Sequence, residues 1–317
     1  MIDAVLLWVD GSDPEFRRRK DEVLGRDSRL TADEVGGDTR YAALGELSWS
    51  VASINRFMPW IRRIFIVTDR QDPTPQLRLT MEHFENPIPV EVVDHSVIYR
   101  GMDDLIPVFN SLSIETLIWR IPGLSRRYIY FNDDMFVMAP MKPEDWFDGD
   151  RLIVHGRRLP LIVAQVAEKF RRGRDGKPAQ GFKTPMIATA KLLGTRHFVY
   201  YYHSPLAQDR ELLERFFESH KDAMRANAAP KFRESQQFST HVLCTMLAER
   251  EGRLRIDNED TNLFLKPLAS RPEYLTERLR RADCNKRLRL GCISSLDRAS
   301  EEQRKEFERW IIRRVTS

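Results

Sequence analysis

The chain has 317 residues, of which 42% are hydrophobic, 31% are charged and 10% are aromatic. This balance excludes an intrinsically disordered chain and a collagen-like fibre. Lys and Arg number 51 against 47 Asp and Glu, and this small net charge of +4 gives no reason to expect nucleic acid as a partner.

Neither the cysteines nor the hydropathy indicate a secreted or membrane-spanning protein. The three cysteines show no CxxC spacing, so we expect neither a disulfide framework nor a zinc site. The longest apolar run covers residues 4–9, far below the roughly 20 residues that cross a bilayer as a helix. Because the chain starts without a basic leader, we expect a cytoplasmic protein.

Four short apolar runs predict buried strands, and an aspartate follows each of them within two residues. In an open α/β sheet the carboxyl ends of parallel strands meet at one edge, where ligands bind. We therefore expect four carboxylates near one edge. The runs cover residues 5–9, 64–68, 90–93 and 128–131, and the aspartates are Asp10, Asp69, Asp94 and Asp133.

Helical spacing separates these runs. Apolar residues recur every three or four positions across 44–58 and across 114–121, where Pro122 and Gly123 end the pattern. Strands that alternate with helices imply a parallel sheet. We therefore predict an α/β fold with a mostly parallel, Rossmann-like sheet flanked by helices.

Beyond residue 150 this alternation weakens. We divide the chain into a Rossmann-like, nucleotide-sugar-binding half (1–150), an insertion (151–200) and a helical half that completes the active site (201–317). Within the insertion, residues 171–185 combine glycines and prolines with basic side chains, which predicts a mobile basic loop.

Two amphipathic patterns predict helices near the C-terminus, at 212–224 and at 307–315. Ser300 and Gln303 form a plausible capping box for the second helix. Arginines flank Trp310, so this helix could lie on a membrane surface, but docking on the parent domain is the preferred interpretation.

The turn after the first predicted strand carries Asp10, Gly11, Ser12 and Asp13. Gly11 permits close backbone approach, and Asp10 can bind a ribose hydroxyl or a base edge, so the turn could hold a nucleotide. An Asx turn, in which Asp and Ser bond the local backbone, explains the same residues equally well.

Asn132, Asp133 and Asp134 lie between two apolar runs. Adjacent buried carboxylates are costly unless a positive group is near. A divalent cation, Mg²⁺ or Mn²⁺, held by Asp133 and Asp134 satisfies this requirement, and Mg²⁺ typically also binds substrate phosphates. The alternative is that these acids cap the next helix.

Four ordered motifs resemble the successive conserved regions of the Stealth family. That family comprises hexose-1-phosphate transferases that build bacterial capsular and surface polysaccharides, and the catalytic part of the lysosomal-enzyme GlcNAc-1-phosphotransferase. The motifs lie in residues 3–14, 47–71, 107–136 and 203–247, and the most specific of them are Trp8-Val9-Asp10-Gly11-Ser12-Asp13-Pro14 and Tyr130-Phe131-Asn132-Asp133-Asp134-Met135-Phe136.

The resemblance implies a GT-A-like fold and a UDP-sugar donor. In such enzymes an acceptor hydroxyl attacks the β-phosphorus, UMP leaves, and a divalent metal is required. It further implies catalytic roles for Glu115, Asp134, His203 and Arg233, with His203 as general base and Arg233 on the phosphate. Judged by its neighbours alone, His203 follows three tyrosines and is more often a core or rim residue. The nucleotide-sugar-binding residues expected from the motifs are Asp10, Gly11, Ser12, Asp13, Asn110 and Arg120.

The chain departs from the family pattern in several places. Leu112 and Trp119 stand where members often have histidines, and Gln236 and Gln237 stand where acids are common. The fourth region, residues 292–297, lacks an Asn and Asp pair, and Ser294, Ser295 and Asp297 are its candidate substitutes. The departures at Leu112, Trp119, Gln236 and Gln237 concern contacts to the sugar or acceptor.

The leading hypothesis is a transferase that moves hexose-1-phosphate, with HexNAc-1-phosphate as the preferred group, from a UDP-sugar to a glycan acceptor in a bacterial surface polysaccharide. We expect the protein in the cytoplasm, with peripheral association with the inner membrane face as an option. A metal-dependent glycosyltransferase that releases UDP is the first alternative. A non-catalytic carbohydrate- or nucleotide-binding module is the second, and the combination of a base with a charge-stabilising arginine argues against it. The sequence leaves the donor sugar and the oligomeric state open.

Overall fold

The computed structural model describes residues 1–26, 41, 43–170, 181–259 and 261–316. Five strands form a central sheet in the order β3-β2-β1-β4-β9. The first four run parallel and β9 runs antiparallel to β4, which confirms the predicted mostly parallel sheet. The strands are β1 (Ile2–Leu7), β2 (Ile64–Thr68), β3 (Val90–Asp94), β4 (Arg127–Asn132) and β9 (Leu206–Asp209).

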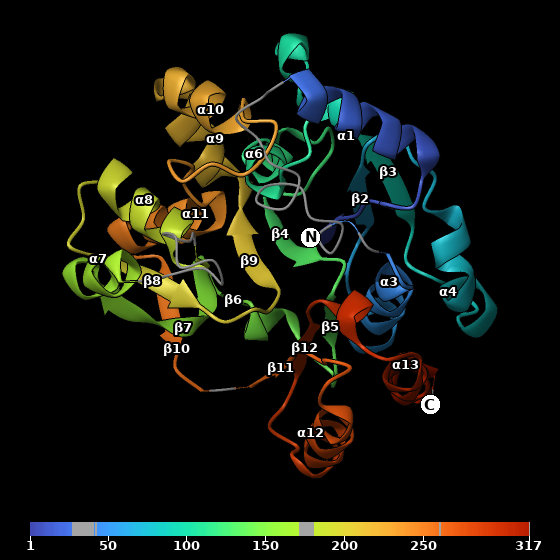
Figure 1. Cartoon of the computed structure of the whole chain (residues 1–317). Helices are drawn as coiled ribbons and strands as arrows, with labels where there is room; N and C mark the ends of the chain where they lie inside the picture. The colour runs from blue at the N-terminus through green and yellow to red at the C-terminus, as the bar shows by residue number, and fades with distance from the viewer. Residues whose placement is uncertain (27–40, 42, 171–180, 260, 317) are drawn as a thin grey trace.

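Helices pack on both faces of this sheet (Figure 1). Ala4 and Leu6 of β1 share a core cluster with α3, whereas Val5 and Leu7 share the other cluster with α5 and α6. Alternate side chains of one strand thus enter two cores, which explains its unbroken apolar sequence. The helices of this half are α1 (Pro14–Arg26), α3 (Glu46–Phe57), α4 (Arg78–His83), α5 (His95–Ile98) and α6 (Ser111–Glu115).

A small three-stranded sheet brings the C-terminal part of the chain to the end of β4. Its order is β11-β12-β5, from β11 (Asn262–Leu265), β12 (Leu290–Ile293) and β5 (Met135–Val137). The backbone N–H of Ile293 donates to the carbonyl of Asp134 at 2.9 Å. This pairing places residues 293–297 beside the two aspartates.

The last helix, α13 (Glu301–Thr316), docks on the parent domain, as preferred from the sequence. Phe307 and Trp310 are buried, and the Phe307 ring packs edge-on against Trp49 of α3 with 5.2 Å between centroids. Ser300 and Gln303 exchange hydrogen bonds at 3.0 and 3.2 Å, the predicted capping box. Among the described residues, no helix has the length and hydropathy needed to span a membrane.

A second sheet, in the order β10-β7-β6 with β8 paired to β7, lies beside the central one (Figure 1). Residues 171–180, which hold most of the predicted basic loop, fall outside the described residues. The remaining elements are β6 (Phe147–Asp148), β7 (Arg151–Pro160), β8 (His197–Tyr201), β10 (Leu254–Asp257), α7 (Leu161–Lys169), α8 (Thr184–Leu192), α9 (Arg210–Ser219), α10 (Lys221–Ala228), α11 (Thr240–Arg250) and α12 (Pro272–Cys284).

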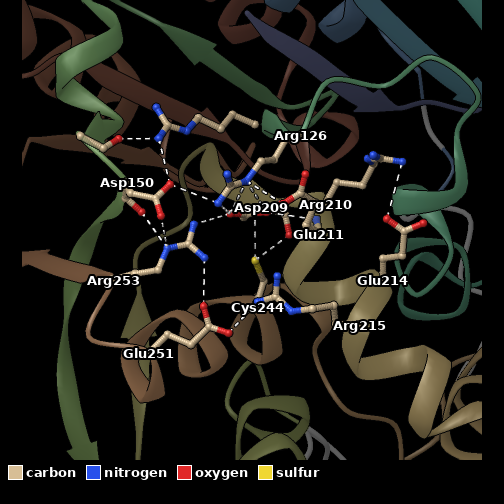
Figure 2. A network of polar contacts seen from close by, with 12 residues as sticks. Arg126, Asp150, Asp209, Arg210, Glu211, Glu214, Arg215, Cys244, Glu251 and Arg253 are labelled. Atoms are coloured by element: carbon tan, nitrogen blue, oxygen red, sulfur yellow. Dashed lines mark hydrogen bonds and ion pairs between the residues drawn. The ribbon is translucent and has the colours of Figure 1, made fainter.

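The two larger sheets are joined by an ion-pair network around Asp209, the last residue of β9 (Figure 2). The Asp209 carboxylate is fully buried and lies 2.6 Å from a guanidinium nitrogen of Arg253 and 3.2 Å from one of Arg126. It also accepts the backbone N–H of Glu211 and so caps α9. These donors together satisfy the buried Asp209 carboxylate. Loss of Asp209 would leave the guanidinium groups of Arg126 and Arg253 without this partner.

Candidate active site

A cavity of about 370 Å³ lies at the carboxyl ends of the central parallel strands. The ends of β1, β2 and β4, the starts of α3, α5 and α6, and the segment after β12 contribute most of its lining. Two of the four aspartates expected at this edge, Asp69 and Asp133, line it. Its polar lining consists of Glu46, Asp69, His95, Asn110, Ser111, Asn132, Asp133, Asp134, Arg233, Ser294, Ser295 and Asp297.

Four acidic side chains gather at one end of this cavity: Glu46, Asp133, Asp134 and Asp297. Burial raises the pKa of Asp134 to about 6. Burial, together with the charges of Asp134 and Glu46, raises the pKa of Asp133 well above its usual range. Burial also raises the pKa of Glu46 to about 7, although the backbone N–H of Leu44 partly offsets it. These upward pKa shifts come from burial and, for Asp133 and Glu46, also from the neighbouring acids.

The donor set of this acidic cluster suits a divalent cation. Oδ1 of Asp134 and Oδ1 of Asp297 are buried without a hydrogen-bond partner in the described structure, so each has a free lone pair. No three His, Cys, Asp or Glu side chains within the described ranges stand in a geometry that would hold a metal by themselves. Mg²⁺ is usually held by one or two carboxylates together with substrate phosphates, and Asp133 and Asp134 would supply such carboxylates.

Arg233 lines the same cavity. Its guanidinium donates to Oγ of Ser111 at 3.0 Å and is otherwise exposed. Asn110 fixes the segment that carries it: the Asn110 amide donates to the carbonyl of Phe232 at 3.0 Å and to Oε1 of Gln237 at 2.7 Å. Asn110 lines the cavity, but its amide acts on the protein, so it positions Arg233. Gln237, a departure from the family pattern, belongs to the same buried network.

A second polar group lies at the ends of β1 and β2. Arg19 of α1 and Asp69 form a buried ion pair at 2.8 Å, and Oδ2 of Asp69 remains without a partner among the described residues. His95 lines the cavity beside them, and burial lowers its pKa. Trp8 and Val9 complete this end. It offers an apolar wall with one free carboxylate oxygen, an arrangement that suits a heterocycle with hydrogen-bonding edges.

Glu115 is buried behind the cavity and does not line it. The Tyr130 hydroxyl lies 3.1 Å from Oε1 of Glu115 and 2.6 Å from Oδ1 of Asn132, a lining residue. Nε2 of His241 lies 3.4 Å from Oε2 of Glu115. Burial alone would raise the pKa of Glu115, but the His241 imidazole and the Arg233 guanidinium lower it overall. Glu115 is therefore linked to the cavity indirectly, by the hydrogen bonds that connect it through Tyr130 to Asn132.

His203 is not among the cavity-lining residues. Its ring lies 3.9 Å from the Phe182 centroid and 5.1 Å from that of Phe264, and burial lowers its pKa. Phe264 pairs in register with Cys292, whose Sγ lies 3.4 Å from Oδ2 of Asp134. Paired residues of neighbouring strands face the same side, so His203 lies on the Asp134 side of this sheet, one strand further out.

The turn of residues 10–13 takes the Asx form. Oδ1 of Asp10 accepts from the backbone N–H and the hydroxyl of Ser12, and Oδ1 of Asp13 accepts from the N–H of Phe16 in α1. A Cβ on Gly11 would lie 2.2 Å from the Tyr41 carbonyl, so only glycine fits there. None of these four residues lines the cavity, although Trp8, Val9 and Tyr41 beside them do.

Arg120 also lies away from the cavity lining. Its guanidinium donates to the carbonyls of Ile98 (2.5 Å) and Arg100 (2.6 Å), which ties the turn after α6 to the end of α5. Sequence reasoning missed Glu46, Arg19 and His95. Glu46 is the first residue of a helix, where acidic residues are common, so it gave no signal of a site. The position of His95 beside the cavity depends on long-range packing.

Family models match the two N-terminal parts of the chain. Residues 2–28 match Stealth protein conserved region 1, and residues 40–154 match Stealth protein conserved region 2. Together these regions include most of the residues that line the cavity from the central sheet and from α6.

Several curated relatives are similar over part of their length. The capsular polysaccharide phosphotransferase WcwK of Streptococcus pneumoniae is 29% identical over 255 residues, 73% of each chain. The receptor polysaccharide phosphotransferase WefC of Streptococcus gordonii is 31% identical over 64% of this chain and 57% of its own. The exopolysaccharide phosphotransferase CpsY of Mycobacterium tuberculosis is 40% identical over 46% of this chain and 25% of its own.

Among solved structures, the galactosyltransferase LgtC in complex with donor and acceptor sugar analogues covers 98% of this chain and 95% of its own, at 10% identity and a TM-score of 0.44. Mouse xyloside xylosyltransferase 1 covers 92% of this chain and 97% of its own, at 10% identity and a TM-score of 0.42. The two matched conserved regions and the phosphotransferase relatives confirm the expectation of a transferase enzyme. Conserved regions 1 and 2 of the Stealth proteins are thus both matched in this chain, over residues 2–28 and 40–154.

Proposed function

We propose that this protein transfers hexose-1-phosphate from a UDP-sugar to a glycan hydroxyl and releases UMP, so that a phosphodiester forms in a surface polysaccharide. The observation that carries the proposal is the single cavity that Asp133, Asp134 and Arg233 line together. Its relatives are polysaccharide phosphotransferases, which supports a phosphoryl group as the part transferred.

In this proposal the nucleotide lies over Trp8 and Val9, with Oδ2 of Asp69 accepting a hydrogen bond from it. The diphosphate extends toward the acids at the other end of the cavity. Asp133 and Asp134 hold Mg²⁺ or Mn²⁺, which supplies positive charge to the phosphate oxygens. Glu46 and Asp297 add negative charge that favours the bound cation.

Arg233 stabilises the charge that builds on the β-phosphoryl oxygens, and Asn110 and Ser111 keep its guanidinium in place. The acceptor oxygen forms its bond to the β-phosphorus while the bond from this phosphorus to the oxygen of UMP breaks. His203, kept neutral by burial, takes the proton of the acceptor hydroxyl. Because His203 lies one strand away from Asp134, the acceptor enters between them.

The test is incubation with a panel of UDP-sugars, Mg²⁺ and short glycan acceptors, followed by separation of the uridine products. UMP that accumulates only with acceptor supports the proposal and identifies the donor. UDP would assign glycosyl transfer instead, because the bond to the sugar carbon would then have broken. No release from any UDP-sugar would contradict the donor assignment and favour a binding module.

A further inference from the structure

The outward face of α7 is apolar. Ile162, Val163, Val166 and the C-cap residue Phe170 are 66%, 60%, 50% and 73% exposed. At 3.6 residues per turn these side chains fall within an arc of about 100°. They make up four of the nine large apolar side chains that are exposed in the described part of the chain, so they form a cluster and not a scatter.

The inward face of this helix is the one that carries polar groups. Oε1 of Glu168 accepts from the backbone N–H of Gly181 at 2.8 Å and from the hydroxyl of Thr184. Ala164, a small residue, is the side chain buried on this side. These bonds tie α7 to the start of α8 in an orientation that leaves its larger apolar residues outside. Such a face indicates an interaction surface.

The charge around α7 indicates the kind of partner. The described residues of the segment around it, 151–170 and 181–200, contain seven Lys and Arg against one Glu, a net charge of +6. Since the whole chain carries +4, the remaining residues carry −2. The exposed basic residues of the described part of this segment are Arg151, Arg157, Arg158, Lys169, Lys191 and Arg196.

A second copy of the chain is a poor occupant for this face, because a symmetric dimer would bring two such basic segments together. An anionic lipid surface matches both properties: its headgroups attract the basic residues, and its acyl boundary accepts the apolar ones. In Figure 1, α7 lies at the outer edge of the second sheet, remote from α3 and α13.

We propose that α7 and the basic residues around it bind the surface of an anionic lipid bilayer, with Ile162, Val166 and Phe170 inserted at the headgroup boundary. For α13 the sequence left a membrane surface open as the less preferred alternative to docking on the parent domain, and α13 indeed buries its apolar face on α3. The surface on α7 is separate from the cavity, and its function does not depend on the reaction that the cavity performs.

The test is co-sedimentation of the full chain with vesicles of phosphatidylcholine alone or mixed with phosphatidylglycerol. Wild-type protein should bind the mixed vesicles and lose binding as salt rises. The double variant Ile162→Ser/Phe170→Ser should bind at least about tenfold more weakly, because two inserted apolar side chains are lost. Met81→Ser on α4 is the matched control, since Met81 is also 66% exposed, and it should bind like the wild type.

Thermal unfolding of each variant checks that it is folded. Equal binding to both kinds of vesicle, absence of binding by the wild type, or equal weakening by Met81→Ser would each overturn the proposal. So would sedimentation velocity that shows a dimer lost in the double variant, because the face would then belong to a second copy. The double variant Lys191→Glu/Arg196→Glu reverses two charges and leaves the apolar residues of α7 unchanged. It should also weaken vesicle binding.

Discussion

Replacement of Asp134 by asparagine should make the cation-free protein more stable at alkaline pH. The pKa of Asp134 is about 6 in the folded protein against an ordinary value of 3.8. The ionised carboxylate therefore costs about 3 kcal/mol of unfolding free energy, at about 1.4 kcal/mol for each pH unit of difference. Because the folded state binds the proton more tightly, this cost is absent below the ordinary pKa, grows up to about pH 6 and is constant above.

Asparagine keeps the shape and can still accept from Sγ of Cys292, but it carries no charge. Urea unfolding in chelator should therefore show Asp134→Asn more stable than the wild type by up to about 3 kcal/mol at about pH 8, with little difference at about pH 4. Mg²⁺ should stabilise the wild type, by about 2.7 kcal/mol at a hundredfold excess over its dissociation constant, and leave the variant unchanged.

Glu85→Gln, which alters an exposed acid far from the cavity lining, is the control and should show neither effect. A variant that is no more stable than the wild type in chelator at about pH 8 would refute the argument that Asp134 is an uncompensated buried charge. An equal response of both proteins to Mg²⁺ would refute the cation site.

His203→Ala should lower kcat by roughly 10²- to 10⁴-fold with the KM for the donor unchanged, and a collapse of donor affinity would instead make His203 a binding or structural residue. Arg233→Lys should lower kcat by roughly 10²-fold or more at similar donor KM, because lysine lacks the planar fork; wild-type kinetics would remove Arg233 from the phosphate site. Asp209→Ala should lower the unfolding free energy by about 3–5 kcal/mol, since Arg126 and Arg253 lose their buried partner. The exposed pair of Glu15 and Arg18 provides its control: Glu15→Ala should cost far less than Asp209→Ala, and similar losses in both variants would contradict the role of burial.

The sequence alone determined the central sheet. Strand β2 occupies the predicted residues 64–68, and α3 covers most of the predicted helix at 44–58. Both follow from local patterns, because apolar runs and helical spacing are properties of neighbouring residues. The predicted helix at 114–121 was only partly right: α6 ends at Glu115, and a short 3₁₀ turn, Ile118–Arg120, follows it.

The sequence also identified Asp133 and Asp134, the two acids that follow β4 and line the cavity. Two adjacent carboxylates between apolar runs are energetically unfavourable unless another group compensates their charge. It could not tell the turn of residues 10–13 from a nucleotide site, since Asp and Ser serve backbone bonding and ligand binding with the same atoms. Nor could it separate Asn110, which positions Arg233, from a residue that touches the donor.

The tertiary structure alone decided which distant segments meet. Glu46, Asp134 and Asp297 come together because β12 pairs with β5 and α3 packs on the same sheet, although Glu46 and Asp297 lie 251 positions apart in the sequence. It also decided that α13 is buried and that α7 presents its apolar face to solvent. Both helices are amphipathic in sequence, and only packing determines whether the apolar side of such a helix is covered.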